Sequence, residues 1–122
     1  MTVYKVVRQS GRRKLVSAFA DRSPVCREYQ DSGGRKKVVD FSLAFKTKEA
    51  AFRYVGGFPL PIYKAECTSC KPVFSLLSLL DLTEERVKSL VEGKLILGLR
   101  TYPAPKGTVL CKNLKIKRRI YK

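Results

Sequence analysis

The chain has 122 residues, a common length for one domain, and 44% of them are hydrophobic, which is too many for a disordered chain. Lysine and arginine number 26 against 10 acidic residues, which gives a formal net charge of +16. Such an excess destabilises a compact state through self-repulsion, and a bound polyanion relieves it. The composition excludes a disordered tail and favours a folded protein that binds a polyanion, with nucleic acid as the first candidate. The alternative is a solvated basic face that only keeps the protein soluble.

No segment reaches the roughly 18 to 20 consecutive apolar residues that a membrane-spanning helix needs. The first residues, Met1–Arg8, read as a strand with charges inside it, unlike a signal peptide. We therefore expect an intracellular protein, cytosolic or nuclear, or one packaged in a virion, that is neither secreted nor bound to a membrane.

The first predicted elements are the two strands of a hairpin. Val3–Arg8 is rich in β-branched and aromatic residues, Gln9–Gly11 is a turn signal, and residues 14–20 continue as the second strand. This places the basic run Arg12, Arg13 and Lys14 at the hairpin tip. Residues 21–35 carry a proline and a glycine pair, so we expect them to be irregular.

The middle of the chain predicts a strand, a helix and a second strand. The strands are residues 38–45 and Ile62–Cys67. The helix is Lys48–Val55, with the Thr47 hydroxyl as its N-cap and Gly56 as its end. Its apolar residues Ala51, Phe52 and Val55 are expected on one face.

A second helix is predicted further along. Pro72–Leu80 is an apolar run whose pattern does not separate helix from strand. Asp81 and Glu84 then form a helix start, so we expect a helix to about Glu92, followed by a strand over residues 94–99. The leucines of the apolar run belong either to the core or to a homodimer interface, which would double the basic surface.

The last segment predicts a half-buried strand with a basic outer face. Leu114, Ile116 and Ile120 alternate with charged or aromatic residues, and Arg118 is the one charge on the apolar face. Together the elements predict a single α+β domain over residues 1–122, with a small antiparallel or mixed sheet, about two helices and a basic C-terminal strand.

Basic residues gather in two stretches without acids, five of them in residues 1–20 and nine in residues 93–122. Chain ends are often neighbours, so we expect these two groups to merge into one patch that Arg35–Lys37 extends. Tyr4 or Tyr121 within it could stack a base. No base-reading helix is evident, so we predict binding with little sequence preference and favour DNA over RNA. The predicted nucleic-acid-binding residues are Arg12, Arg13, Lys14, Arg35, Lys36, Lys37, Lys112, Lys115, Lys117, Arg118 and Arg119.

Catalytic chemistry is poorly represented in this sequence. The chain has no histidine, which removes the commonest general base and every histidine-ligated metal site. An enzyme would need a deep pocket with buried acids such as Glu28 or Glu66. We therefore expect no catalytic residue, no cofactor and no enzymatic activity.

Four cysteines remain to be explained. Cys67 and Cys70 have the spacing of a zinc knuckle, but a structural zinc site needs four ligands, and Cys26 and Cys111 are single and distant. We expect plain buried thiols and no bound metal. The alternatives are one zinc site that uses all four cysteines and a redox pair at Cys67 and Cys70.

Four short motifs follow one another in the first 70 residues: YKVV at Tyr4–Val7, LVSA at Leu15–Ala18, FxTxEAAxxY at Phe45–Tyr54 and YKAEC at Tyr63–Cys67. This order resembles small uncharacterised proteins of phages and large (giant) DNA viruses. The resemblance implies a viral origin and no particular activity. A basic viral protein would serve in genome packaging or early infection, as part of the virion. The alternative function is a viral interaction module that targets an acidic host protein.

Overall fold

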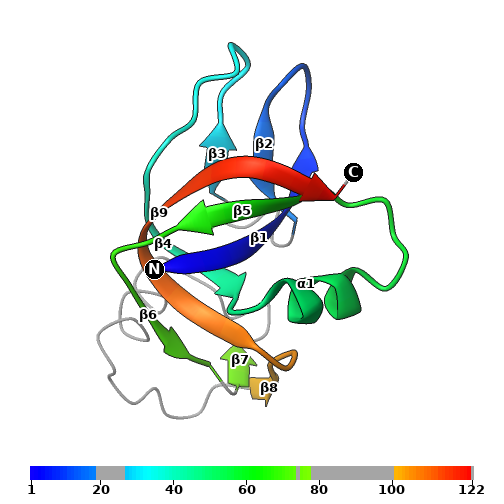
Figure 1. The fold of residues 1–122 in the computed structure, drawn as a ribbon, viewed down its shortest axis with the longest axis vertical. Coiled ribbons are helices and arrows are strands. Elements are labelled where there is room, and N and C mark those ends of the chain that lie inside the picture. Colours follow the sequence, from blue (N-terminus) through cyan, green and yellow to red (C-terminus); the bar gives the residue numbers. More distant parts are fainter. Residues whose placement is uncertain (19–26, 74, 78–100, 122) are drawn as a thin grey trace.

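The computed structural model describes residues 1–18, 27–73, 75–77 and 101–121. Within these residues the protein is mostly β, with a single helix lying against the sheet (Figure 1). The helix is α1 (Lys48–Val55). The strands are β1 (Thr2–Gln9), β2 (Leu15–Ser17), β3 (Glu28–Gln30), β4 (Val39–Phe45), β5 (Ile62–Glu66), β6 (Ser69–Pro72), β7 (Ser75–Leu77), β8 (Thr101–Pro103) and β9 (Thr108–Tyr121).

The predicted α+β class with about two helices is wrong, because strands dominate the described residues. Several of these strands have only three or four residues, too few to show an alternating pattern in the sequence. One of them, β3, falls in the stretch of residues 21–35 that we predicted to be irregular. The predicted helix to Glu92 and the strand over residues 94–99 lie outside the described residues.

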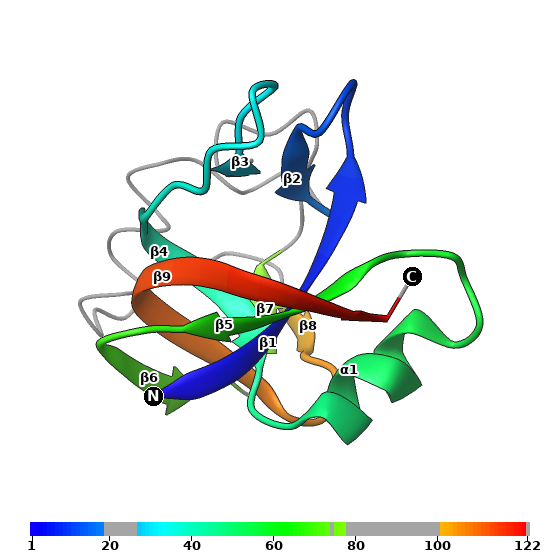
Figure 2. The same cartoon turned by 45° about the horizontal axis from the view of Figure 1, so that its top comes forward.

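Four strands close into a barrel through antiparallel pairings of β1 with β5, β5 with β9, β9 with β4, and β4 with β1. Closure depends on the length of β9, whose first part pairs with β4 and whose last part, from Lys115, pairs with β5. Asn113 lies one residue before the end of the first part and adopts the left-handed region, at φ 52°, which asparagine tolerates better than most residues. Both ribbon views show β9 arching across the barrel from β4 to β5 (Figures 1 and 2).

Two hydrophobic cores follow from the alternation of side chains along the strands. Val3 and Val7 of β1 point into the barrel, where twelve buried residues cluster with Leu114 and Ile116 among them. Val6 of the same strand points outward and packs with the helix. The barrel interior and the layer beneath α1 are therefore separate cores on the two faces of β1.

The predicted hairpin and first helix are confirmed. β1 pairs with β2 at Gln9 and Leu15. α1 has the predicted bounds: the Thr47 Oγ1 accepts from the amide of Ala50 at 3.2 Å, and Gly56 ends the helix at φ 58°. Phe52, however, is not on the buried face, since 39% of it is exposed.

A bulge in β9 explains why Arg118 does not lie on the buried face of the strand. Ala65 of β5 pairs with Ile116, yet the preceding residue Lys64 pairs with Arg118, so Lys117 is an extra residue on β9. Paired residues share a face of the sheet and neighbours along a strand alternate, so Arg118 leaves the buried face of Ile116 and joins Lys64. The expectation of a charge on the apolar face was therefore wrong, because the alternation is interrupted at Lys117.

Candidate nucleic-acid interface

The tip of the first hairpin lies against the loop that follows β3. The Gln30 Nε2 donates to the carbonyl oxygen of Arg13 at 2.6 Å. A Cβ added at Gly34, in that loop, would stand 3.3 Å from the Cδ of Arg13, so the arginine side chain runs along the glycine. The basic tip, Arg12 to Lys14, is thereby held beside the basic run that begins at Arg35.

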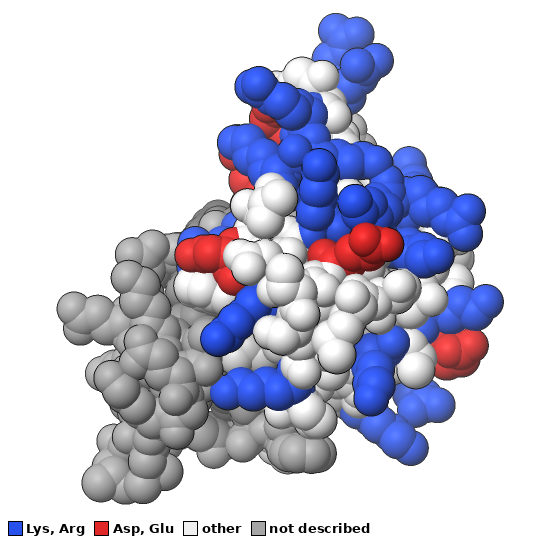
Figure 3. All heavy atoms as spheres, turned by 60° about the vertical axis from the view of Figure 1, so that its left-hand side comes forward, with Lys and Arg blue, Asp and Glu red and all other residues white. Residues whose placement is uncertain are grey.

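The same loop also reaches β9, where the Lys36 Nζ donates to the carbonyl oxygen of Lys117. Three segments that are far apart in the sequence therefore meet at one end of the molecule. We call this group the basic surface, and its members are Arg12, Arg13, Lys14, Arg35, Lys36, Lys37 and Lys117. Lys and Arg atoms crowd this end in the space-filling view, over the loops after β1 and β3 (Figure 3).

Two carboxylates lie within the basic surface, and both stabilise its loops. Glu28 pairs with Lys37 at 2.8 Å and with Lys14 at 3.7 Å. The hydrogen bond from Lys37 is the main reason that the pKa of Glu28 lies below its ordinary value. Asp31 pairs with Arg35 at 3.0 Å.

Asp31 also accepts hydrogen bonds from the amides of Gly33 and Arg35. The hydrogen bond from the Arg35 amide is the first cause that lowers the pKa of Asp31. Within the described residues, the other four cations of the basic surface have no carboxylate within the 4.0 Å ion-pairing distance. These four are Arg12, Arg13, Lys36 and Lys117.

The remaining predicted residues lie elsewhere. Lys112 lies in the first half of β9, where it pairs with Ser69 of β6, and Lys115 lies opposite Glu66 of β5. Arg119 is exposed one residue beyond Arg118, and Arg118 faces the helix side of the barrel. The long strand spreads these residues over different sides of the barrel.

The two chain ends do not lie next to each other, so the basic segments do not meet there as we expected. The amino group of Met1 donates to the carbonyl of Cys67, whereas Tyr121 pairs with Ile62. Ile62 begins β5 and Cys67 directly follows its last residue, so the two partners lie roughly 16 Å apart at 3.3 Å per residue. Figure 1 shows the two ends on opposite sides of the barrel. The basic segments meet through hairpin loops instead.

One of the counted N-terminal cations is not on the surface. Lys5 points into the barrel, is only 5% exposed, and donates from Nζ to the carbonyl oxygen of Leu43. Its Nζ also stands 5.2 Å from the ring centroid of Tyr29, close enough for a cation–π contact. Lys5 therefore satisfies an internal carbonyl and adds nothing to an anion-binding face.

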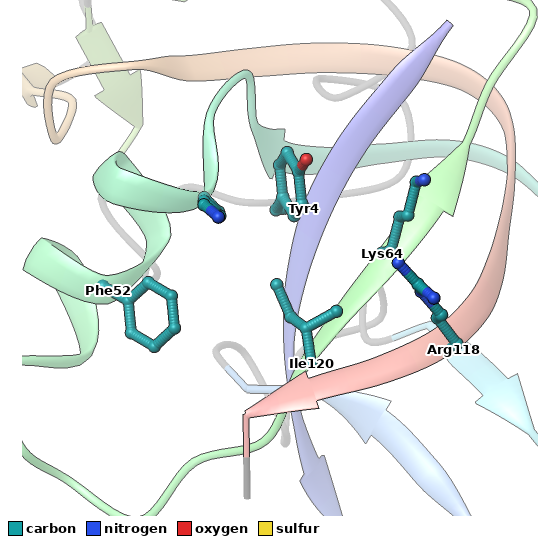
Figure 4. A pocket seen from close by; sticks show the side chains of 6 residues that line it. Tyr4, Phe52, Lys64, Arg118 and Ile120 are labelled. Carbon is teal, nitrogen blue, oxygen red and sulfur yellow. The ribbon is translucent and has the colours of Figure 1, made fainter.

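A pocket of about 210 Å³ opens beside α1. Tyr4 of β1, Lys64 of β5 and Arg118 of β9 form a row across three paired strands, because Lys64 pairs with both of the others. The helix contributes Lys48 and Phe52, and Ile120 completes the lining. Figure 4 shows Phe52 and Ile120 directed toward each other, with Lys64 and Arg118 together across the pocket.

Four of these residues were not among the predicted site residues, namely Lys48, Phe52, Lys64 and Ile120. Lys64 follows Tyr63 and precedes Ala65, so the alternation marked it as facing away from a buried side. Its pairing with Tyr4 and Arg118 depends on strand register, which no local signal reveals. The acids named for an enzyme, Glu28 and Glu66, do not line this pocket.

Three cysteines lie near one another at the end of the barrel where the chain begins. Cys70 pairs with Cys111 across β6 and β9, and the thiols of Cys67 and Cys111 interact. All three are free, and the described residues hold no group of three or more cysteine or acidic side chains placed to bind a metal. Cys26, the fourth ligand of the zinc alternative, lies outside the described residues.

Burial raises the pKa of both Cys67 and Cys111. We therefore expect these two thiols to react slowly with iodoacetamide in the folded protein at pH 8.5, where free thiols are about half ionised. Denaturation in urea should bring them to the rate of free cysteine, as read from labelled peptides by mass spectrometry. Fast labelling of Cys111 in the folded protein would contradict its burial.

The raised pKa of these two thiols also makes folding less favourable as pH rises above about 8.5, because only the unfolded state then loses these protons.

No family model, curated protein or solved structure matches this chain. Among the described residues no helix has the length and apolar character needed to cross a membrane.

Proposed function

We propose that this protein is a non-catalytic nucleic-acid-binding protein that holds the phosphate backbone of DNA or RNA on its basic surface. The observation that carries the proposal is the contact between Lys36 and the Lys117 carbonyl. It joins the hairpin loops to the C-terminal strand, so cations from three distant segments face one region of solvent. That region has seven cations and two carboxylates, and this excess of positive charge favours the binding of a polyanion.

The arrangement also favours binding with little sequence preference. Base readout in the major groove usually needs a helix or a two-stranded ribbon that presents side chains to base edges. Here α1 buries Ala50, Ala51 and Val55 against the barrel, and the basic surface consists of loop residues and one strand. Lysine and arginine on such a surface contact phosphates, and phosphate contacts carry no direct sequence information.

A salt titration tests the proposal. Duplex DNA of random sequence should bind at low salt, with log affinity falling against log salt at a slope near −0.9 for each phosphate contact. The four cations that lack a carboxylate partner among the described residues give an expected slope of about −3 to −4. Failure to bind DNA or RNA at 50 mM salt would end the proposal.

The resemblance to phage and giant-virus proteins extends the proposal to a virion-associated protein inside a host cell. A pull-down from infected cells, with and without nuclease, tests this step. Partners that disappear after nuclease treatment support nucleic-acid binding. An acidic host protein that stays bound after nuclease treatment would favour the interaction module instead.

A further inference from the structure

The pocket beside α1 gathers three cations from three different elements. Lys48 belongs to the helix, Lys64 to β5 and Arg118 to β9, and the bulge at Lys117 is what turns Arg118 toward Lys64. None of the six lining residues is acidic. In the part of the chain that the structure describes, none of these three cations has an ion-pair partner. Like charges this close repel each other, and an anion placed between them removes that repulsion.

The opposite side of the pocket is apolar and aromatic. Phe52 meets the ring of Tyr121 edge-on at 4.9 Å between centroids, which fixes its orientation. Even so, 39% of Phe52 is exposed, although it belongs to a helix that buries its other apolar residues. Ile120 extends this side, and the half-buried Tyr4 lies in the row with Lys64 and Arg118. A flat ring of a ligand could therefore stack here while its anionic group reaches the cations.

Cations beside an exposed aromatic ring are the combination that binds unpaired nucleotides. The pocket, at about 210 Å³, is smaller than the roughly 300 to 1,000 Å³ that hold drug-sized ligands, so it has room for no more than one nucleotide of a strand. On β9, Arg118 of the pocket follows Lys117 of the basic surface directly, although the two residues lie on different sides of the barrel. A single strand that uses both sites would therefore pass over β9.

We propose that this pocket takes one unpaired nucleotide, with its phosphate between Lys48, Lys64 and Arg118 and its base against Phe52 and Ile120. The inference rests on the proposed function and deepens it, since it assigns a preference for single strands over duplexes. A duplex keeps its bases stacked inside, so it can use the basic surface but not the apolar side of the pocket.

The test compares a twelve-nucleotide single strand with the duplex of the same sequence, by fluorescence anisotropy at equal salt. The wild-type protein should bind the single strand more tightly. Phe52→Leu should weaken single-strand binding about 5- to 100-fold, the range for losing one stacked base, and leave duplex binding within about twofold. Phe58→Leu is the matched control, because Phe58 is a 69% exposed phenylalanine outside the pocket lining, and it should change neither affinity.

A second variant, Lys64→Gln, tests the phosphate side without touching the ring. It should weaken binding of the single strand more than binding of the duplex, and it should reduce the salt slope for the single strand by about 0.7. A competition arm adds free thymidine monophosphate or inorganic phosphate at equal ionic strength, and the nucleotide should displace the single strand at lower concentration. If inorganic phosphate displaced the single strand as well as thymidine monophosphate does, the proposed contact with the base would be wrong.

The outcomes separate this inference from the proposed function. If both nucleic acids bind and Phe52→Leu leaves their affinity ratio unchanged, the pocket assignment is wrong while the basic surface stands. If neither nucleic acid binds at low salt, the proposed function fails and takes the pocket assignment with it. Thermal melting of each variant confirms that a lost affinity does not come from lost folding.

Discussion

The double variant Arg12→Gln with Lys117→Gln is expected to bind duplex DNA about 60-fold more weakly than the wild type at 0.1 M salt. Each lost phosphate contact removes about 0.9 from the salt slope, which corresponds to nearly tenfold in affinity at this salt concentration. The two residues lie at opposite ends of the sequence, yet both belong to the basic surface, and neither has an ion-pair partner within the described ranges. Their replacement should therefore leave the fold unchanged.

The control variant is Lys46→Gln with Lys106→Gln, which removes the same two charges elsewhere. These exposed lysines lie near each other, because the amide of Lys46 donates to the carbonyl of Gly107 at 2.9 Å. They lie at the end of the barrel near α1 and β8, away from the loops after β1 and β3 (Figure 1). The control should keep its affinity within about twofold and its salt slope unchanged. Equal losses in both variants would show that net charge, and not the basic surface, drives binding.

Local signals predicted the elements that depend on neighbouring residues. Thr47 and Gly56 mark the ends of α1 because a cap hydroxyl and a left-handed glycine act within one turn of the helix. The hairpin of β1 and β2 was evident because its turn lies between two strand-forming stretches. Gly107 shows the limit of such signals. Its turn sits so close to Ala50 that a Cβ on the glycine would lie 2.7 Å from the alanine Cβ, a contact between residues far apart in the sequence.

The barrel itself could not be predicted, because its closure depends on pairings between distant strands. β9 pairs with three other strands, and its bulge at Lys117 changes which face Arg118 occupies. A single extra residue of this kind is invisible to an alternation argument, which assumes an unbroken strand. Lys5 was counted as a surface charge for a similar reason, since a lysine paired with an internal carbonyl looks like any other lysine in the sequence.

The candidate site was predicted in part. The basic runs at the hairpin tip and at Arg35–Lys37 do converge, but through the Gln30 contact and the Lys36 contact, not through the chain ends. Lys112 was grouped with them because it belongs to the same basic C-terminal segment as Lys117, but it lies five residues earlier on β9, where it pairs with Ser69 of β6. The pocket was missed because its cations are single residues on separate elements.

The second large effect is expected at Tyr29, whose replacement by alanine should lower the free energy of unfolding by about 3 to 5 kcal/mol. Tyr29 is 1% exposed, and its ring fills the barrel interior beneath Lys5. Its hydroxyl hydrogen-bonds with the hydroxyls of Ser42 at 2.6 Å and of Ser17 at 3.3 Å. Removing the side chain leaves a cavity and takes one hydrogen bond from each of the two serine hydroxyls.

Tyr29→Phe separates these two contributions, because it keeps the ring and removes only the hydroxyl. It should cost about 1 kcal/mol, the net contribution of a lost hydrogen bond, because Ser17 keeps its hydrogen bonds with Arg27 and Ser42 keeps its contact with the Leu43 carbonyl. Tyr63→Phe is the matched control, since Tyr63 packs against the same core while the described residues offer its hydroxyl no hydrogen bond. Its cost should stay within about 0.5 kcal/mol. Urea unfolding measures all three variants, and equal values for Tyr29→Phe and Tyr63→Phe would contradict the buried network.

Tyr29 also connects the stability of the barrel to the basic surface. It lies on β3 between Glu28, which pairs with Lys14 and Lys37, and Gln30, which holds the Arg13 carbonyl. Tyr29→Ala should therefore weaken duplex binding even below its unfolding transition, although no charge is removed, because β3 loses its anchor in the core. Tyr29→Phe keeps that anchor and should bind like the wild type. Unchanged binding by a folded Tyr29→Ala protein would show that the loops hold their cations together without β3.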